Sequence, residues 1–483
     1  MKKHFLFYLL FTTIFGLLIW FIIVQGKQLE AGRDLSGQSL EIPATTTQAS
    51  PLEAWGESLT DNLGHPLSLL LLQIAVIILC ARLFGFLFGK FGQPTVIGEI
   101  IAGIVLGPSL LGWLWPQVSG WLFRPDSLPT LQFFSQLGLL LFMFIIGLEL
   151  DVSLLKNKAQ AAVVVSHAGI VFPFFLGVWL AYGLFSQFAP GGVSFVAFGL
   201  FMGIAMSITA FPVLARIIQE RGLTQSPLGA LAITCAAADD VTAWCLLAAI
   251  VALIQAGTVM TALFTVLLAV IYVGLMFLGV RPLLQRLSAR YGQPGQVNKT
   301  FVAALFIVLF LSALATEVIG IHALFGAFLA GAMMPSAPAF RHWLIARIAD
   351  VSLVILLPLF FAFTGLKTQV GLLNNGGLWL VCGLIILVAV VGKFGGSLVA
   401  ARFTGQSWAD SCAIGALMNT RGLMELVVLN IGYDLGILSP TIFTMMVLMA
   451  LITTFMTTPA LSLIDYFSRR RVSTQNHSVS KVF

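Results

Sequence analysis

Two adjacent aspartates lie in the middle of an apolar stretch of the chain, AAADDVTAW. A carboxylate at the centre of a membrane-spanning helix costs about 2.5–3.5 kcal/mol on insertion scales, so a pair of them indicates a function. Adjacent residues on an α-helix point about 100° apart, which prevents Asp239 and Asp240 from presenting their oxygens identically to one small ion. We expect one carboxylate to face an ion pathway and the other a neighbouring helix, with different proton affinities. The alternative is a salt-bridged structural pair.

A single lysine, Lys393, lies well inside another apolar run, VAVVGKFGGSLVA. The glycines around it allow a neighbouring helix to approach closely. A lysine in this position either extends its side chain to the membrane interface or pairs with an acid. Because the interface is distant from mid-span, pairing is favoured, and Asp239 is the partner that we expect.

Two places in the chain predict an interrupted helix. In the run SITAFP at 207–212, Pro212 lacks an amide hydrogen and its ring disfavours helix at Phe211. In the run MNTRG at 418–422, polar groups and a glycine interrupt an apolar segment. Irregular backbone at membrane depth is tolerated only where it is buried in protein or lines a cavity. The breaks therefore predict an internal site, and a proline kink and a loop end are the simpler alternatives.

Polar residues at or beside these breaks are secondary candidates for the site: Ser207, Asn419, Thr420, Arg421 and Glu425. Arg421 and Glu425 are four residues apart and can form an ion pair on one helical face. This pair either closes the cavity or only stabilises the broken helix. Other titratable residues rank as weaker candidates: Glu99, Glu149 and Glu317, together with His167 and His322, which in such positions are more often structural.

The elements that position these residues are apolar segments along nearly the whole chain. Of the 483 residues, 59% are hydrophobic and 9% are charged, against about 25% charged in an ordinary soluble domain. A helix needs about 20 residues to cross the hydrocarbon core. Fourteen spans are predicted, at 5–24, 67–89, 94–114, 131–150, 160–186, 194–217, 227–254, 257–280, 300–320, 323–340, 351–366, 377–402, 409–433 and 440–465. The sequence therefore predicts an all-α polytopic membrane protein.

The two ends of the chain set its predicted topology. Lys2 and Lys3 precede an apolar run without a small-residue cleavage site, so 1–26 is predicted to be an uncleaved signal anchor, with a removed signal peptide as the alternative. The acidic segment 27–66 is expected outside, and 466–483 is expected to be a short cytoplasmic tail. Threading the spans from a cytoplasmic N-terminus places most Lys and Arg residues inside, as the positive-inside rule requires, and leaves both termini cytoplasmic.

The remaining thirteen spans, in 67–465, divide into two units of equal size. Six spans precede a connector at 257–280, and six follow it. The first unit enters the membrane from outside and the second from inside, and the predicted breaks fall in the fifth helix of each. This arrangement is typical of inverted-repeat transporters, whose sites lie near the midplane where broken helices of the two halves meet.

Composition also excludes other classes. The five cysteines all fall in apolar runs, without the spacing of a metal site or a disulfide framework. The net charge of +6 comes from bases in short loops rather than from a patch with interleaved aromatics, so nucleic-acid binding is not expected. No cofactor is expected either.

Six motifs together are specific enough to indicate a family. They are QPTVIGEIIAGIVLGPSLLG (93–112), SITAFPVLARII (207–218), AAADDVTAW (236–244), HALFGAFLAGAMMP (322–335), GKFGGSLVAAR (392–402) and NTRGLMELVVLNIGYDLG (419–436). In order and in type they resemble the cation/proton antiporter-2 family of bacterial and plant monovalent cation/proton antiporters. The resemblance covers about 67–465.

The resemblance implies a thirteen-helix fold with a dimerisation domain and a mobile core domain that contains two crossed, broken helices. It implies that Asp240 binds the cation and exchanges protons, that Asp239 pairs with Lys393, and that Thr209 helps to line the site. It further implies a homodimer in a bacterial inner membrane that exchanges Na⁺ or K⁺ for H⁺. The short tail after 465 lacks the nucleotide-binding domain of potassium-efflux members, so regulation by nucleotide is not expected.

Three other functions compete with antiport. An ion channel would use the same charged cavity, and an organic-anion transporter would use a similar inverted-repeat fold. An intramembrane aspartyl protease would need two carboxylates from separate helices that share a water, whereas Asp239 and Asp240 are neighbours on one helix. The expected chemistry is therefore transport rather than catalysis, and the sequence does not separate Na⁺ from K⁺.

Overall fold

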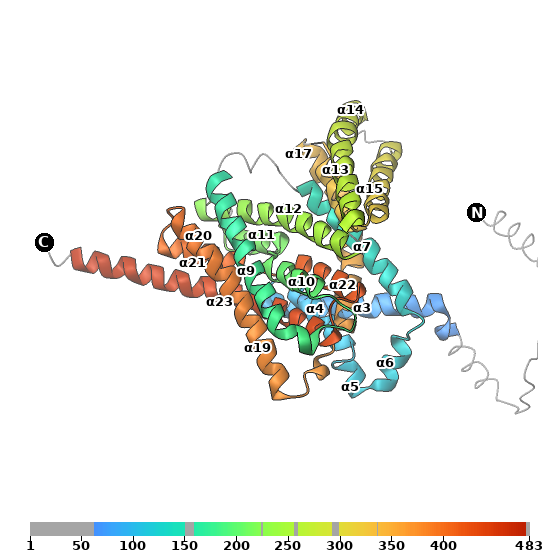
Figure 1. Ribbon diagram of the computed structural model, residues 1–483, viewed down its shortest axis with the longest axis horizontal. Coiled ribbons are helices and arrows are strands. Elements are labelled where there is room, and N and C mark those ends of the chain that lie inside the picture. Colours follow the sequence, from blue (N-terminus) through green and yellow to red (C-terminus); the bar gives the residue numbers. More distant parts are fainter. Residues whose placement is uncertain are drawn as a thin grey trace, which may run out of the picture. The chain divides into compact units, whose positions relative to one another are not determined.

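The structure, a computed structural model, describes residues 62–149, 159–223, 226–255, 259–291, 299–335 and 337–479. The chain divides into two units, residues 1–63 and Gly64–Phe483, and the second unit holds every candidate residue. Within the described ranges all regular elements are helices (Figure 1). The predicted signal anchor at 1–26 lies outside the described residues, as does the acidic segment up to residue 61.

The first half of the described chain consists of α3 (Pro66–Lys90), α4 (Thr95–Leu106), α5 (Leu111–Leu114), α6 (Pro116–Leu122), α7 (Leu128–Glu149), α9 (Ala159–Phe188), α10 (Phe195–Ser207), α11 (Phe211–Glu220) and α12 (Pro227–Gln255). The second half consists of α13 (Val259–Leu275), α14 (Arg281–Tyr291), α15 (Lys299–Ile319), α16 (Ala323–Ala332), α17 (Pro338–Ala349), α18 (Leu357–Lys367), α19 (Gly376–Val390), α20 (Gly396–Phe403), α21 (Trp408–Met418), α22 (Leu423–Asp434) and α23 (Pro440–Val479). Single π-helical turns join α13 to α14, α17 to α18 and α19 to α20.

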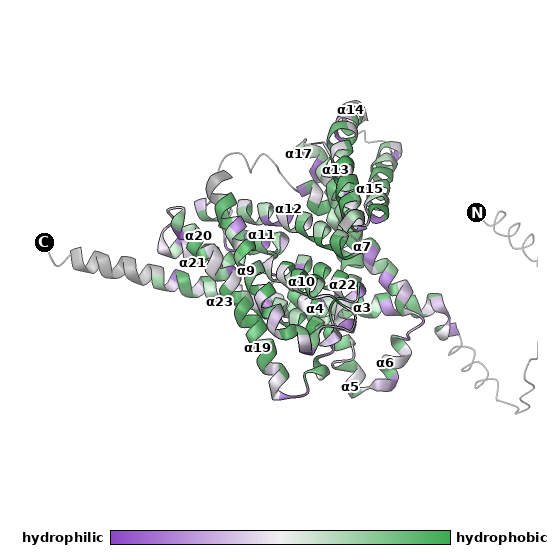
Figure 2. Cartoon of the chain, viewed as in Figure 1, coloured by the Kyte–Doolittle hydropathy of each residue, from purple (hydrophilic) through white to green (hydrophobic). Residues whose placement is uncertain are grey.

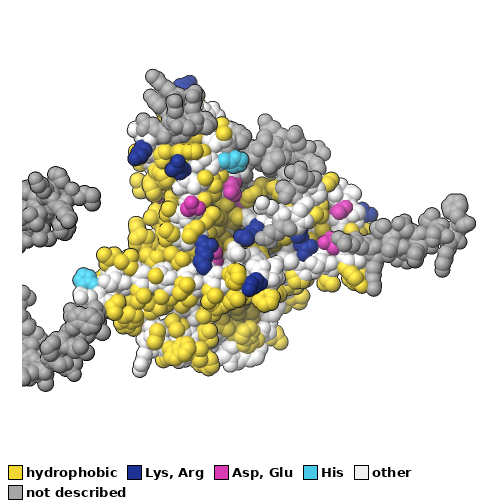
Figure 3. Space-filling view, turned by 180° about the vertical axis from the view of Figure 1, so that it is seen from behind, with side chains coloured by type: hydrophobic (Ala, Val, Ile, Leu, Met, Phe, Trp, Pro, Cys, Tyr) yellow, Lys and Arg dark blue, Asp and Glu magenta, His cyan; other side chains and the backbone are white. Residues whose placement is uncertain are grey.

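The helices of this unit have the length and composition of membrane spans. Within the described residues, eleven helices are long and apolar enough to cross a membrane, and the bent α21–α22 pair makes twelve if it is one span. Their outer faces are apolar (Figure 2), and side chains such as Leu79 on α3 and Leu278 in the π-helical turn after α13 are 69% and 83% exposed. Hydrophobic side chains also cover most of the face in Figure 3. Such a surface requires a lipid solvent.

Two predicted boundaries are wrong. The segment expected to span at 323–340 contains α16, whose ten residues are about 15 Å long at 1.5 Å per residue and cover only half of the hydrocarbon thickness of about 30 Å. The next span, expected at 351–366, belongs instead to the continuous stretch Ala339–Leu372. The basic residues near the start of this stretch lower its hydropathy, so the sequence predicted a loop there. In the structure Arg341 donates to the carbonyl oxygens of Leu148 and Pro335, and the segment is helical.

Helical structure is interrupted at both predicted places. α10 ends at Ser207 and α11 begins at Phe211. α21 ends at Met418 and α22 begins at Leu423, with a bend of 41° between them. The interrupted helices lie side by side, since α10 and α22 contact each other near the middle of the bundle (Figure 1).

Candidate ion-binding site

The two helix breaks touch through their backbones. The amide of Ala210 donates to the carbonyl of Thr420 at 3.0 Å, and the hydroxyl of Thr209 reaches the carbonyl of Met418 at 3.2 Å. Gly422 makes this approach possible, because a Cβ atom there would lie 3.1 Å from the side chain of Val213. Backbone groups freed by each break are thereby partly satisfied by the other break, as buried polar groups require.

Asp239, on α12, is fully buried and saturated with partners. Its Oδ2 lies 2.8 Å from Nζ of Lys393 and accepts a hydrogen bond of 2.7 Å from the hydroxyl of Thr209. Its Oδ1 accepts from the hydroxyl of Ser166, on α9, at 2.5 Å. The sequence predicted that Thr209 lines the site but did not indicate which aspartate it contacts. In the structure the hydroxyl of Thr209 binds Asp239. A carboxylate with this many donors is held in one orientation.

Lys393 is also completely buried, in the π-helical turn between α19 and α20. Besides Asp239, its ammonium donates to the carbonyl oxygens of Gly169, at 2.8 Å, and of Ser207. These three acceptors use all three donors of the ammonium group. Gly392 lets α9 approach this turn, since a Cβ atom there would lie 3.0 Å from Pro173. Single π turns of this kind recur at functional sites.

Asp240 has a different environment, although it follows Asp239 directly. Its side chain is buried, and its Oδ1 has no hydrogen-bond partner among the described residues. It borders a narrow cavity of about 10 Å³ for a water-sized occupant, beside Ile208 at the first break and Met424 on α22. A buried carboxylate without donors is unstable as a bare anion, so this position favours a bound proton or a bound cation.

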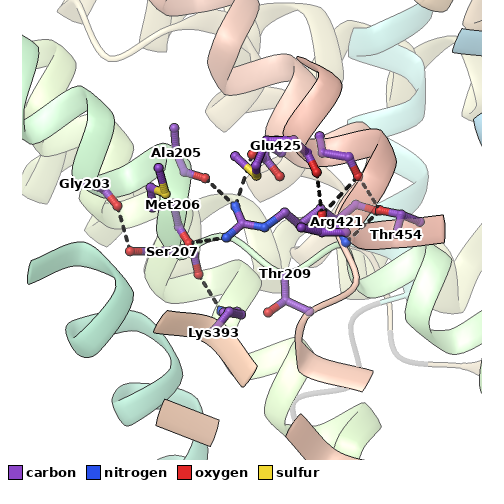
Figure 4. A network of polar contacts seen from close by, with 12 residues as sticks. Gly203, Ala205, Met206, Ser207, Thr209, Lys393, Arg421, Glu425 and Thr454 are labelled. Carbon is purple, nitrogen blue, oxygen red and sulfur yellow. Dashed lines mark hydrogen bonds and ion pairs between the residues drawn. The ribbon is translucent and has the colours of Figure 1, made fainter. Parts of the chain in front are cut away.

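Arg421 caps the end of the first broken helix. Its guanidinium donates to the carbonyl oxygens of Ala205, at 2.9 Å, and Met206, at 2.7 Å, while Lys393 binds the carbonyl of Ser207 (Figure 4). Three consecutive carbonyls at the C-terminal end of α10 therefore accept from two cations. This end of a helix carries a partial negative charge and unpaired acceptors, which both cations compensate. Arg421 thus stabilises the broken helix.

The other secondary candidates lie around the breaks without contacting either aspartate. Oε1 of Glu425 lies 3.1 Å from Arg421, and its Oε2 has no partner among the described residues. The hydroxyl of Ser207 donates back to Gly203, and that of Thr420 faces Thr457 on α23. Asn419 is buried, with its side-chain oxygen unpaired within the described part of the chain.

Two polar residues of the network were not predicted. Ser166 binds Asp239, and the hydroxyl of Thr454, on α23, accepts from the amide of Arg421 and donates to its carbonyl. The only sequence signal for them is a small polar residue inside an apolar run, which many structural positions share. Of the weaker candidates, Glu99 is buried on α4, His167 is exposed on α9, and Glu317 and His322 line a separate cavity.

Within the described residues, no three His, Cys, Asp or Glu side chains converge as they would around a bound transition metal. The site instead offers one unpaired carboxylate and the carbonyl-rich backbone of two helix breaks. Oxygen ligands of this kind suit hard cations, and the single free carboxylate suits a single charge.

Comparison with known proteins assigns this arrangement to a family. The family profile described as "Sodium/hydrogen exchanger, transmembrane" matches residues 75–464. The chain belongs to the sodium/hydrogen exchanger family. The match begins within α3, ends within α23 and contains both helix breaks, Asp239, Asp240 and Lys393.

Individual antiporters resemble the chain over most of its length. It is 45% identical over 396 residues to the Na⁺/H⁺ antiporter NhaS4 of Synechocystis, covering 82% of this chain and 97% of that one. It is 40% identical over 418 residues to cation/H⁺ antiporter 17 of Arabidopsis thaliana, covering 86% of this chain but only 51% of the plant protein. The fold matches the sodium proton antiporter MjNhaP1 of Methanocaldococcus jannaschii, with a TM-score of 0.64 at 13% identity, over 83% of this chain and 99% of that one.

Proposed function

We propose that this protein is a secondary antiporter that exchanges a monovalent cation, Na⁺ or K⁺, for H⁺ across the membrane that it spans. The observation that carries the proposal is the unlike environment of two adjacent buried carboxylates. Asp239 has three donors, whereas Oδ1 of Asp240 has none. The relative NhaS4 is named a Na⁺/H⁺ antiporter, which supports Na⁺ as the first cation to test.

The proposed cycle depends on competition at Asp240. A proton or a cation neutralises this carboxylate, and the two exclude each other because they bind the same oxygens. When neither is bound, an uncompensated charge in an almost closed cavity opposes movement of the core. Only the two occupied states cross, so each cation that moves one way is exchanged for protons moving the other way. Lys393 releases Asp239 when the cation binds, which lets the second carboxylate contribute.

The broken helices supply the proposed mobile element. We infer that α10–α11 and α21–α22 cross at their breaks near the membrane midplane, as inverted-repeat transporters require. The backbone contacts between the breaks support this inference, as does the capping of α10 by Arg421 and Lys393. We further propose that the protein is a homodimer in a bacterial inner membrane with both termini cytoplasmic. The positive-inside threading supports the orientation, and the Synechocystis relative supports the membrane.

Three rival functions fit the site less well. An organic-anion transporter needs a free cation at its site, but the three donors of Lys393 are occupied and Arg421 binds Glu425 and two carbonyls. A channel needs a continuous water-filled path, whereas the cavity at Asp240 has room for about one water. An aspartyl protease is disfavoured because Asp239 is bound to a lysine.

Flux in reconstituted vesicles tests the proposal. A cation gradient should drive proton movement, read with an internal pH-sensitive dye, in the unmodified protein and in Asp126→Asn, which alters an exposed ion pair. Asp240→Asn should abolish the coupled flux, with the elution profile of the folded protein unchanged. Cation flux without proton movement would indicate a channel, and coupled exchange by Asp240→Asn would refute the site assignment.

A further inference from the structure

A second, larger cavity of about 170 Å³ lies apart from Asp240. Its lining includes four titratable or charged side chains that come from separate elements: Glu317 on α15, His322 before α16, Lys367 at the end of α18 and Asp434 at the end of α22. In the predicted threading, all four lie at the extracytoplasmic ends of their spans. Because the structure brings these four span ends together around one cavity, we place the cavity on the extracytoplasmic face and call it the vestibule.

The fixed charges of the vestibule nearly cancel. Nζ of Lys367 lies 2.5 Å from Oδ1 of Asp434, so this pair is close to neutral. Glu317 remains as an uncompensated negative charge, and its Oε2 accepts from the amide of Ala323 at the start of α16. From α7 only neutral polar groups, including Gln132 and Gln136, face the cavity. The net charge is therefore −1 while His322 is neutral and zero when it is protonated.

His322 is held in an unusual conformation. Its φ of 75° makes it the one non-glycine residue with positive φ among the described residues. Such strain in a non-glycine residue is uncommon and gathers at functional positions. Its Nδ1 lies 3.4 Å from the amide of Leu324, where a neutral imidazole caps the N-terminus of α16. Protonation removes this acceptor and places a positive charge at the positive end of the helix dipole.

The environment of His322 favours its neutral form. Burial lowers the pKa of His322 from its ordinary value of 6.5, and the charges of Glu317 and Asp434 oppose this shift. A lowered pKa means that the imidazole is neutral at pH 7 and above. Its positive charge appears only as the pH of the vestibule falls below 6.5.

The vestibule and the Asp240 cavity share a helix. Val427, Asn430 and Asp434 of α22 border the vestibule, while Met424 and Val428 border the Asp240 cavity. Successive turns of one helix thus connect the two. A cation that enters through the vestibule therefore passes its charges before it reaches Asp240, and local charge of one sign changes the concentration of counter-ions in such a space.

We propose that this vestibule is the extracytoplasmic entrance for the transported cation, and that protonation of His322 lowers the affinity with which the cation enters from that face. The proposal rests on the proposed function, since it assumes cation/proton exchange at Asp240. Acid on this face then weakens cation uptake in two ways: protons compete at Asp240, and the vestibule loses its net negative charge.

The test separates these two effects by measuring the apparent KM for Na⁺ and for K⁺ from the vestibule face of oriented proteoliposomes. The pH on that face is varied between about 7.5 and 5.5 while the opposite face is held constant. His322→Asn remains neutral throughout, and asparagine tolerates positive φ better than most residues. Between these pH values the KM of the unmodified protein should rise roughly three to ten times more than that of His322→Asn, as expected for one added charge near the path.

Two further variants keep the result decisive. Glu317→Gln retains an acceptor for the cap of α16 but removes the net charge, so its KM at pH 7.5 should already be raised by a similar factor. His167→Asn, which changes an exposed histidine on α9, should follow the unmodified protein. Superimposable pH profiles for the unmodified protein and His322→Asn, or an unchanged KM in Glu317→Gln, would overturn the proposal. Absence of any exchange by the unmodified protein would instead refute the proposed function.

Discussion

Lys393 and Asp239 form an ion pair of 2.8 Å in which both side chains are completely inaccessible to solvent. Burying two charges is expensive, and such a pair adds little stability compared with apolar residues of the same size. Its position is more informative than its energy. The lysine joins α12 to the end of α10 and to α9, so the pair fixes three helices around the first break.

Removing one member of this pair should be much worse than removing both. Lys393→Met leaves Asp239 with an uncompensated charge and should lower the unfolding free energy by about 3–5 kcal/mol. Combining it with Asp239→Asn should restore a large part of this loss, because no bare charge remains. Thermal unfolding of the purified single and double variants provides the cycle, and additive effects of the two substitutions would contradict the direct pairing.

Thr209 should stabilise the protein through its hydrogen bond to Asp239. Thr209→Val removes the hydroxyl that donates to Asp239 at 2.7 Å and also lies 3.2 Å from the carbonyl of Met418, and it should destabilise the protein by about 1.5–3 kcal/mol. Thr209→Ser retains the hydroxyl and should remain within about 1 kcal/mol of the parent. Equal melting temperatures for the serine and valine variants would contradict a stabilising role of the hydroxyl.

The contact between the breaks should depend on the missing side chain of Gly422. Gly422 has a φ of 156°, and in Gly422→Ala the new Cβ atom would lie 3.1 Å from Val213. The unfavourable backbone conformation and the crowding together should cost about 1–3 kcal/mol. Adding Val213→Ala removes the side chain that the new methyl group would meet. The double variant should therefore be more stable than the sum of the two single substitutions predicts. Gly436→Ala, also at a positive φ but with open space at its Cβ, is the control for the backbone conformation, and Gly183→Ala is the control for an added methyl group alone. A normal melting temperature for Gly422→Ala would contradict the close approach of the two breaks.

Arg421 should be sensitive to conservative replacement. Arg421→Lys keeps the charge but cannot reach two carbonyls and Glu425 with one planar group. It should lower the melting temperature and reduce exchange, because the end of α10 loses part of its cap. Arg402→Lys, which alters an exposed arginine at the end of α20, is the matched control. Indistinguishable Arg421→Lys and Arg402→Lys proteins would exclude a capping role.

The sequence was sufficient for features that depend on local chemistry. Pro212 forbids continued helical hydrogen bonding, so the first break is predictable, and a lysine in mid-span favours pairing with an acid. The sequence was insufficient where the outcome depends on distant neighbours. Ser166 precedes Asp239 by 73 residues, and nothing local distinguishes it from other serines in apolar helices.

The span boundaries failed for a similar reason. Hydropathy measures composition, and α16 is apolar but only ten residues long, because it begins at Ala323 as predicted and ends at Ala332, shortly before Pro335. Conversely, α17 has a lower hydropathy but continues into α18 through a π-helical turn. Its Arg341 is compatible with this position because it donates to the carbonyl oxygens of Pro335 and Leu148. Tertiary contacts, not the window average, decide both cases.

The central claim is that the proton and the cation share Asp240, and proton release on cation binding tests it most directly. Na⁺ or K⁺ added to the purified protein in weakly buffered solution should displace protons, read with a pH dye. Asp126→Asn should release as many protons as the parent and Asp240→Asn none. Undiminished proton release from a folded Asp240→Asn protein would contradict the claim.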